Sequence, residues 1–185
     1  MTSGDSRVVI GPLMAADLIP LFNWFNDVEA ARLDAAFRPV DWPSHQTWFE
    51  TIGRDFSKVF FALRRMGAPE ILGFVTIANI NAVHRSAEIG VRIGEEKNRN
   101  QGFGAEALAL GLDFCWRHLN LQRVWLHAFH NNQRALRLYL KAGFKKEGLL
   151  RRAAYVDGSW VDVVPMATLR PRTLSPPAPA AARPG

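Results

Sequence analysis

Glu88-Ile-Gly-Val-Arg-Ile-Gly-Glu-Glu-Lys-Asn-Arg-Asn-Gln-Gly-Phe-Gly-Ala105 is the stretch that decides the fold. It begins as an apolar strand over residues 89–93, continues as a basic loop, and reaches a long helix that opens at Gly102-Phe-Gly104. The first N–H groups of a helix have no partner within the helix, and neighbouring glycines let a ligand approach the backbone closely. The stretch therefore predicts an anion site suited to a phosphate or pyrophosphate group.

The segments on either side predict an α/β (α+β) protein with a mixed sheet. Three strands with short connections, at residues 58–64, 71–78 and 87–93, are typical of an antiparallel meander. The helix at residues 102–119 has an apolar face that must pack on a sheet, and a strand at residues 122–128 then returns parallel to the third strand. Further elements are expected at residues 7–10 (strand), 17–36 (helices), 43–52 (helix), 132–142 (helix), 146–155 (strand) and 159–169 (strand), the last two joined by a tight turn at Asp157-Gly158.

Length and composition predict one globular domain over residues 1–169 and a disordered tail over residues 170–185. The chain has 185 residues, of which 48% are hydrophobic and 22% are charged, and the tail holds five of its eleven prolines. No apolar run reaches ~18 residues, and the first residues lack the features of a signal peptide. A single cysteine, Cys115, allows no internal disulfide. We therefore expect a cytoplasmic protein that does not enter a membrane.

The net charge of +6 overstates how basic the folded domain is. Arg170, Arg172 and Arg183 lie in the tail, which has no acidic residue, so residues 1–169 carry the remaining +3. A charge of this size is not the footprint of a nucleic-acid-binding protein, and we expect no nucleic-acid partner. A mild positive field does favour an anionic cofactor or substrate.

Three other kinds of ligand for the glycine loop fit the sequence poorly. A dinucleotide fold needs a carboxylate about 20 residues after the glycines, but residues 114–146 contain no Asp or Glu. The P-loop pattern G-x-x-x-x-G-K-[ST] is absent from the sequence. His127 and His130 have no third ligand at a suitable spacing, so no metal site is expected.

Two motifs and a hairpin resemble those of a known family. Arg99-x-x-Gly102-x-Gly104 resembles the acetyl-CoA pyrophosphate motif, Q/R-x-x-G-x-G/A, of the GNAT superfamily of N-acetyltransferases. Asn132-x-Arg-Ala135-x-x-x-Tyr139-x-Lys-x-Gly143-Phe144 is similar to the family's second hallmark, at the expected distance downstream. Tyr155-x-Asp-Gly158-x-Trp-x-Asp162 resembles the terminal hairpin of the RimJ/RimL-like branch, the ribosomal-protein alanine acetyltransferases.

The resemblance implies a fold and a cofactor. The fold is a twisted mixed sheet of about seven strands with helices on both faces, in which the fourth and fifth strands splay apart into a cleft for the pantetheine arm. The cofactor is acetyl-CoA, the acetyl donor, with no metal. Its pyrophosphate is expected on the backbone of the glycine loop and its pantetheine along the fourth strand. The expected cofactor-binding residues are Val91, Arg92, Ile93, Arg99, Asn100, Gln101, Gly102, Phe103, Gly104, Ala105, Asn132 and Tyr139.

Acetyl transfer to an amine also needs an acid for the leaving thiolate and a way to obtain the neutral amine. By resemblance, Tyr139 is the expected acid. The base is open between two residues: Glu88 on the fourth strand, and His127, which stands twelve residues before Tyr139 on the fifth strand. Imidazole changes charge near neutral pH, which suits the task, and a third possibility is that no base is needed.

The sequence leaves the acceptor open. A primary amine is expected, either a protein N-terminus, as in the RimJ/RimL-like branch, or a small molecule; a homodimer is also expected to be possible for this branch. The run from His45 to Phe49, followed by Phe60-Phe61, resembles amino-sugar acetyltransferases of the superfamily, so an amino-sugar nucleotide is the alternative acceptor. A non-catalytic acetyl-CoA-binding module is the second alternative. A polyamine would favour an acidic pocket, and the positive domain argues against it.

Overall fold

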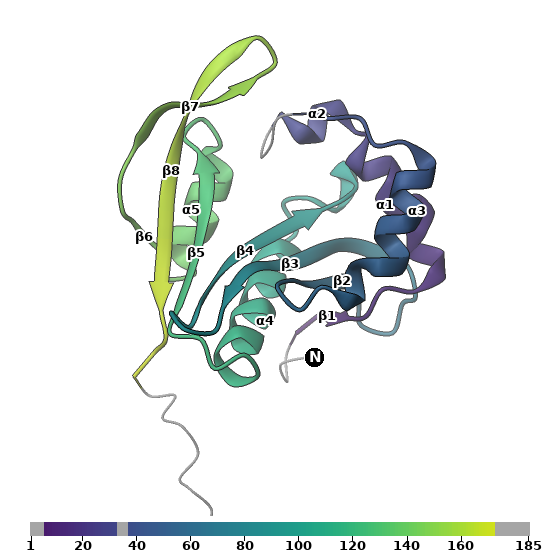
Figure 1. Cartoon of the computed structure of the whole chain (residues 1–185), viewed down its shortest axis with the longest axis horizontal. Helices are drawn as coiled ribbons and strands as arrows, with labels where there is room; N and C mark the ends of the chain where they lie inside the picture. The colour runs from purple at the N-terminus through teal and green to yellow at the C-terminus, as the bar shows by residue number, and fades with distance from the viewer. Residues whose placement is uncertain (1–5, 33–36, 173–185) are drawn as a thin grey trace, which may run out of the picture.

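Eight strands form one mixed sheet, and helices cover both of its faces (Figure 1). The computed structural model describes residues 6–32 and 37–172. The strands are β1 (Val8–Gly11), β2 (Val59–Arg65), β3 (Ile71–Asn81), β4 (Ser86–Ile93), β5 (Arg123–Phe129), β6 (Lys145–Lys146), β7 (Leu150–Val156) and β8 (Ser159–Leu169). The α-helices are α1 (Leu18–Phe25), α2 (Val28–Ala31), α3 (Trp42–Thr51), α4 (Phe103–Arg117) and α5 (Gln133–Lys141), with short 3₁₀ turns at η1 (Ala15–Asp17), η2 (Ile52–Arg54) and η3 (Glu96–Asn98).

The order of the strands confirms the predicted meander and crossover. Strands β1 to β4 are antiparallel neighbours in chain order, α4 crosses one face, and β5 returns parallel to β4. The last strand, β8, lies antiparallel to β5 and carries both β6 and β7. The turn between β7 and β8 is the predicted Asp157-Gly158, whose positive φ values of 48° and 77° are those of a tight hairpin turn.

The sixth strand differs from the expectation. The run at residues 146–155 was expected to be one strand, but it divides into β6 and β7, which gives eight strands instead of about seven. Glu147 stands at the break and turns its carboxylate to the guanidinium of Arg123. The pairing of β7 then shifts between Leu150 and Ala154, where Arg152 has a φ of 49°. A shift of register at a left-handed residue within a strand is typical of a β-bulge.

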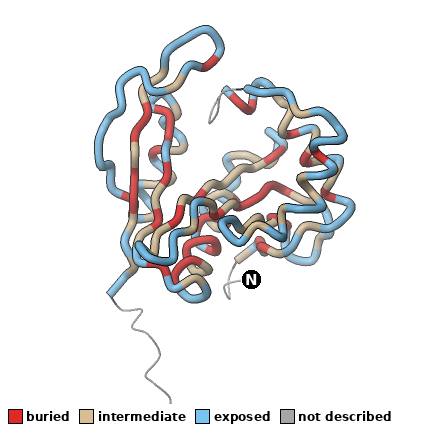
Figure 2. The backbone as a smooth tube through the Cα atoms, in the orientation of Figure 1, coloured by how far each residue is buried: buried red, intermediate tan, exposed pale blue. Residues whose placement is uncertain are grey.

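Two apolar layers cover the two faces of the sheet. On one face, α4 packs on Val75 and Ile77 of β3 and on Ile89 of β4, and α5 adds Leu136. On the other face, Leu21 and Trp24 of α1 meet Phe74 of β3, with Trp48 of α3 beside them. Figure 2 shows the buried residues along the central strands and α4, and the exposed tip of the β7–β8 hairpin. The boundary between β4 and β5 therefore has α4 and α5 on one face of the sheet and α1 and α3 on the other.

Cys115, the single cysteine of the chain, lies in the layer under α4. Its side chain is fully buried, and burial raises the pKa of the thiol to about 12. The interpretation of Cys115 as a packing residue agrees with this position.

Strands β4 and β5 pair over only part of their length. Ser86, Ala87 and Glu88 face residues 123–125, and beyond this point the two strands diverge (Figure 1). The far half of β4 is therefore bonded on the β3 side and open on the other. This opening is the splay that the GNAT resemblance implies.

Some expectations fall at the edges of the described chain. The helical run expected up to Ala36 is α2, which ends at Ala31, and residues 33–36 lie outside the described residues. Most of the expected tail, residues 173–185, also lies outside them. Within the described ranges, no helix is both long and apolar enough to cross a membrane.

Candidate active site

A cavity of about 230 Å³ occupies the opening between β4 and β5. The N-terminal ends of α4 and α5 both reach it, through Gly102 and Gly104 on one side and Asn132 and Ala135 on the other. Ten of the twelve residues expected to bind the cofactor line this cavity: Val91, Arg92, Ile93, Arg99, Asn100, Gly102, Gly104, Ala105, Asn132 and Tyr139. The remaining lining residues are Ala30, His127, Ala128, Phe129, Arg134, Ala135 and Leu138.

The electrostatics of the cavity suit an anion. Arg92, Arg99 and Arg134 line it, and its described lining includes no Asp or Glu. Two helix N-termini add the positive ends of their dipoles. A pyrophosphate is therefore matched both by charge and by unpaired N–H groups.

The glycine loop is held in a shape that only certain residues can adopt. Gly102 is the N-cap of α4 with a φ of 88°, and Asn100 before it has a φ of 62°. A Cβ at Gly102 would also come within 2.9 Å of Nη2 of Arg7. Arg99 donates from Nη2 to the carbonyl of Gly94 at 2.9 Å, which fixes the loop to the end of β4.

Gln101 and Phe103 do not line the cavity. The side chain of Gln101 bonds to the carbonyl of Lys97, and its own carbonyl accepts from Arg7 at 2.8 Å. The ring of Phe103 is buried in the core beneath the guanidinium groups of Arg7 and Arg65, each 5.0 Å from the ring centroid. Both side chains support the loop from behind.

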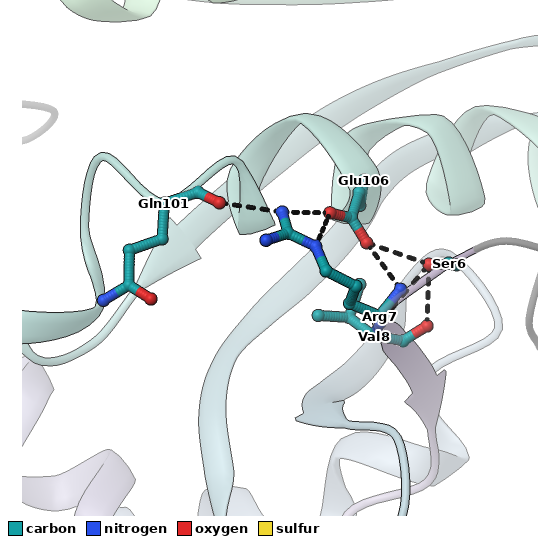
Figure 3. A network of polar contacts seen from close by, with 5 residues as sticks. All are labelled: Ser6, Arg7, Val8, Gln101 and Glu106. Carbon is teal, nitrogen blue, oxygen red and sulfur yellow. Dashed lines mark hydrogen bonds and ion pairs between the residues drawn. The ribbon is translucent and has the colours of Figure 1, made fainter.

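Arg7 and Glu106 brace the loop, and the sequence did not predict their role. Arg7 donates its backbone N–H and its Nε to the two carboxylate oxygens of Glu106, each at 2.8 Å, while its Nη2 reaches Gln101 (Figure 3). Ser6 adds a bond from its hydroxyl to Glu106. An acid in the first turn of α4 is a sequence signal. Its partner lies 99 residues away and carries no such signal.

The brace changes the titration of Glu106. Partial burial would raise the pKa of its carboxyl, but the hydrogen bonds and charge of Arg7 outweigh burial and leave the pKa lowered. The carboxylate therefore stays charged and holds β1 against the first turn of α4.

The two candidate bases, Glu88 and His127, lie side by side where β4 and β5 part. Oε1 of Glu88 is 3.9 Å from Nδ1 of His127, and both side chains are partly exposed. Asn79 donates to the other carboxylate oxygen of Glu88 at 2.8 Å, and Trp125 packs against the imidazole with ring centroids 5.3 Å apart. The sequence treated the two residues as alternatives, whereas the structure brings them together as one pair.

Tyr139 and Asn132 come to the cavity from α5. Asn132 is the N-cap of this helix, and its side-chain oxygen accepts from the N–H of Ala135 at 3.1 Å. Tyr139 lies almost two turns further and packs against Phe144 with ring centroids 5.7 Å apart. The side chain of Tyr139 therefore packs against the core and also lines the cavity.

No group of three or more His, Cys, Asp or Glu residues that could hold a metal ion occurs in the described ranges. A second cavity of about 580 Å³ lies under α3 on the other face of the sheet, among Phe25, Trp48, Phe60 and Phe74. His45 is fully buried beside it, with its Nε2 2.8 Å from the carbonyl of Leu18. The aromatic run recognised in the sequence thus forms a packed layer around a cavity.

Comparison with known proteins agrees with the fold. Spermidine N(1)-acetyltransferase from Vibrio cholerae is 33% identical over 57% of this chain and 60% of its own length. An uncharacterized N-acetyltransferase of Bacillus subtilis, YoaA, is 31% identical over 67% of this chain and 70% of its own. The crystal structure of the Vibrio cholerae enzyme in complex with CoA and spermine superposes with a TM-score of 0.81 at 25% identity, over 89% of this chain and 96% of that chain.

The expected branch is less well supported than the superfamily. The [ribosomal protein uS5]-alanine N-acetyltransferase of Escherichia coli is 25% identical over 77% of this chain and 74% of its own, a weaker similarity than that of the spermidine enzymes. A family model described as an acetyltransferase (GNAT) domain matches residues 7–145. The chain therefore belongs to the GNAT acetyltransferase family.

Proposed function

We propose that this protein is an acetyl-CoA-dependent N-acetyltransferase that acts on a primary amine. The observation that carries the proposal is the cavity at the β4–β5 opening, where an arginine-lined anion site also contains Tyr139 and lies beside the Glu88–His127 pair. Membership of the GNAT family supports the same activity.

The chain's own residues fit the donor. The amides at the start of α4, from Gly102 to Ala105, would hold the pyrophosphate. Because β5 turns away, the far half of β4 has backbone groups available for the extended pantetheine, which would pair at Val91 to Ile93 like an added strand. When bound, acetyl-CoA supplies an acetyl group already activated as a thioester.

The proton that the acceptor must lose is assigned to the Glu88–His127 pair. A primary amine has a pKa of about 10, so at neutral pH it arrives as an ammonium ion and cannot attack. The paired carboxylate and imidazole stand at the parting of the strands, on the side of the sheet opposite α4. A proton taken by one of them, directly or through a water, leaves the neutral amine beside β4.

The proton that the leaving sulfur must gain is assigned to the hydroxyl of Tyr139. Its position on α5 at the cavity and the motif from Asn132 to Phe144 support this role. Backbone N–H groups of β4 would meet the developing oxyanion.

Three kinds of acceptor are proposed. Small primary amines come first, since similar enzymes of Vibrio cholerae and Escherichia coli are named for spermidine. The RimJ/RimL-like option, a protein N-terminal amine, is kept because of the terminal hairpin and the weaker similarity to the uS5-alanine enzyme. An amino-sugar nucleotide is the third candidate, favoured by the three arginines along the cavity.

The test measures CoA release from acetyl-CoA with a panel of peptide N-termini, polyamines and amino-sugar nucleotides. We expect acetyl-CoA to raise Tm, because a ligand that binds only the folded state stabilises it, and at least one amine to release CoA. Absence of both effects at millimolar acetyl-CoA would refute the proposal.

Tyr139→Phe tests the assigned acid. We expect kcat to fall by roughly 10²-fold or more while acetyl-CoA still raises Tm, because only the donated proton is lost. Tyr155→Phe is the matched control: it is the other tyrosine of the chain, and it lies exposed on β7 against Trp160. Equal kcat for Tyr139→Phe and the control would remove the acid role.

A further inference from the structure

Arg92 has a buried guanidinium nitrogen without a partner. Nη2 of Arg92 makes no hydrogen bond and is shielded from solvent. An unpaired N–H of a charged group is costly to bury, so such a group in a native structure calls for an explanation. Arg64, the buried arginine of β2, shows how this fold satisfies the same side chain: it bonds to Asp17 and to the carbonyls of Pro12 and Pro69.

The position of Arg92 in the sheet indicates what could pair with this nitrogen. In the sheet Arg92 stands opposite Phe74, which packs in the α1 layer, so its side chain is on the face away from α4. Its neighbours on that face of β4 are Gly90 and Gly94, which have no side chain, and beyond Gly90 stands Glu88. Thr76 packs on Gly90 and Trp24 packs on Gly94. On this face β4 therefore presents the cation of Arg92 at one end and the Glu88–His127 pair at the other.

The spacing suits a small ligand that bridges the two ends. Four residues of strand separate the Cα atoms of Glu88 and Arg92 by about 13 Å. An amine at the Glu88–His127 end would then have its far end close to Arg92. Among the described residues that line the cavity, none is an Asp or Glu that could compete for the guanidinium.

We propose that Arg92 binds an anionic group, a carboxylate or a phosphate, carried by the acceptor amine. The inference rests on the proposed acetyl transfer and names the chemical class of its acceptor. A guanidinium matches the planar or tetrahedral oxygens of such groups with two parallel hydrogen bonds. A polyamine would instead bring a second cation to Arg92, which repels it, so the acceptor differs from that named for the spermidine relatives.

The experiment compares matched amines that differ in one end group. One arm uses 5-aminopentanoate, 1,5-diaminopentane and pentylamine, and the other uses O-phosphoethanolamine and ethanolamine, with spermidine alongside. We expect kcat/KM for at least one anionic member to exceed that of its cationic or neutral counterpart by roughly 10- to 100-fold. A preference in the first arm identifies a carboxylate as the preferred group, and a preference in the second arm identifies a phosphate.

Two variants assign the preference to Arg92. Arg92→Met keeps an unbranched apolar stem but removes the guanidinium, and it should reduce the preference for the anionic amine to within about threefold, whereas Arg92→Lys should keep most of it. Arg117→Met is the matched control, since it removes an exposed arginine that pairs with Asp113 at the far end of α4. The Tm shift with acetyl-CoA is measured for each variant to verify that it still folds and holds the donor.

The outcomes separate the inference from the proposed function. Release of CoA with diamines or spermidine at rates equal to or above those of the anionic amines overturns the role of Arg92 and leaves acetyl transfer intact. An anionic preference that survives in Arg92→Met overturns it as well. No CoA release with any amine, together with no Tm shift, refutes the acetyltransferase itself.

Discussion

Glu88 and His127 lie 3.9 Å apart, and we propose that the two side chains act as a coupled unit on one proton. Glu88→Gln and His127→Asn should each lower kcat/KM at pH 7 by roughly 10²-fold, because either change breaks the path of the proton. The double variant should lose little more than the worse single variant, since residues that act together are not additive. Steady-state rates of the wild type, the two single variants and the double variant complete this double-mutant cycle.

The loss of kcat/KM in the Glu88 and His127 variants should also depend on pH. As the pH approaches ~10 the acceptor amine is neutral in solution and needs no base, so the variants should recover towards the wild-type rate. His84→Asn, at an exposed histidine in the β3–β4 turn, is the control. Losses that multiply in the double variant would mean that the two residues act independently.

Residues inside a motif were predictable, and residues across the fold from it were not. The glycine loop, the strand before it and the α5 motif led to ten of the cavity residues, because each segment is local and its chemistry is carried by neighbours in the chain. Arg7 acts on the same loop from β1, and the orphan nitrogen of Arg92 exists only because the fold buries it. Neither property depends on sequence spacing, so no pattern could report it.

At the scale of the element, the brace from β1 to α4 should make stability depend on acid. The lowered pKa of Glu106 means that its carboxylate stabilises the folded state above the ordinary value of 4.5 and loses this contribution as pH falls through the folded pKa. Glu106→Gln should therefore cost about 1 kcal/mol at pH 7, a fall in Tm of about 2–4 °C.

The difference in stability between the wild type and Glu106→Gln should depend on pH. The difference in Tm between the wild type and Glu106→Gln should narrow as the pH is lowered below 4.5, because the wild-type carboxylate is then protonated as well. Glu50→Gln, at an exposed glutamate of α3, should show no such trend. A gap that is constant from pH 7 to pH 3 would argue against the brace.

Element boundaries followed the sequence where local signals were strong. The Asp157-Gly158 turn and the start of α5 at Asn132 carry specific turn and cap residues, and both lie where predicted. The division of residues 146–155 into β6 and β7 did not show in the sequence; at the break, Glu147 bonds to Arg123 of β5, 24 residues away in the chain. Long-range contacts of this kind override local strand preference.

At the scale of the whole molecule, α2 and the β7–β8 hairpin face each other across the mouth of the β4–β5 opening (Figure 1). Arg32 of the α2 C-cap reaches Asp157 at the hairpin turn, with the two charged groups 3.1 Å apart. The bridge joins segments that are far apart in the chain, and α2 also contributes Ala30 to the lining of the cavity. We expect it to influence acceptor binding more than stability.

Asp157→Asn tests this expectation, because asparagine tolerates the left-handed φ of 48° and removes only the charge. Tm should stay within about 2 °C of the wild type, since the pair is exposed. KM for the acceptor should rise roughly two- to fivefold while KM for acetyl-CoA does not change. A rise in both KM values, or in neither, would contradict a role at the acceptor entrance.

The buried thiol of Cys115 has a practical consequence for such measurements. With a pKa of about 12, roughly one thiol in ten thousand is ionised at pH 8, and the side chain is closed to reagents in the folded state. A thiol-reactive dye therefore measures released CoA without a contribution from the folded protein. In denaturant the same dye should find one thiol per chain, so Cys115 is also a built-in, stoichiometric reporter of unfolding.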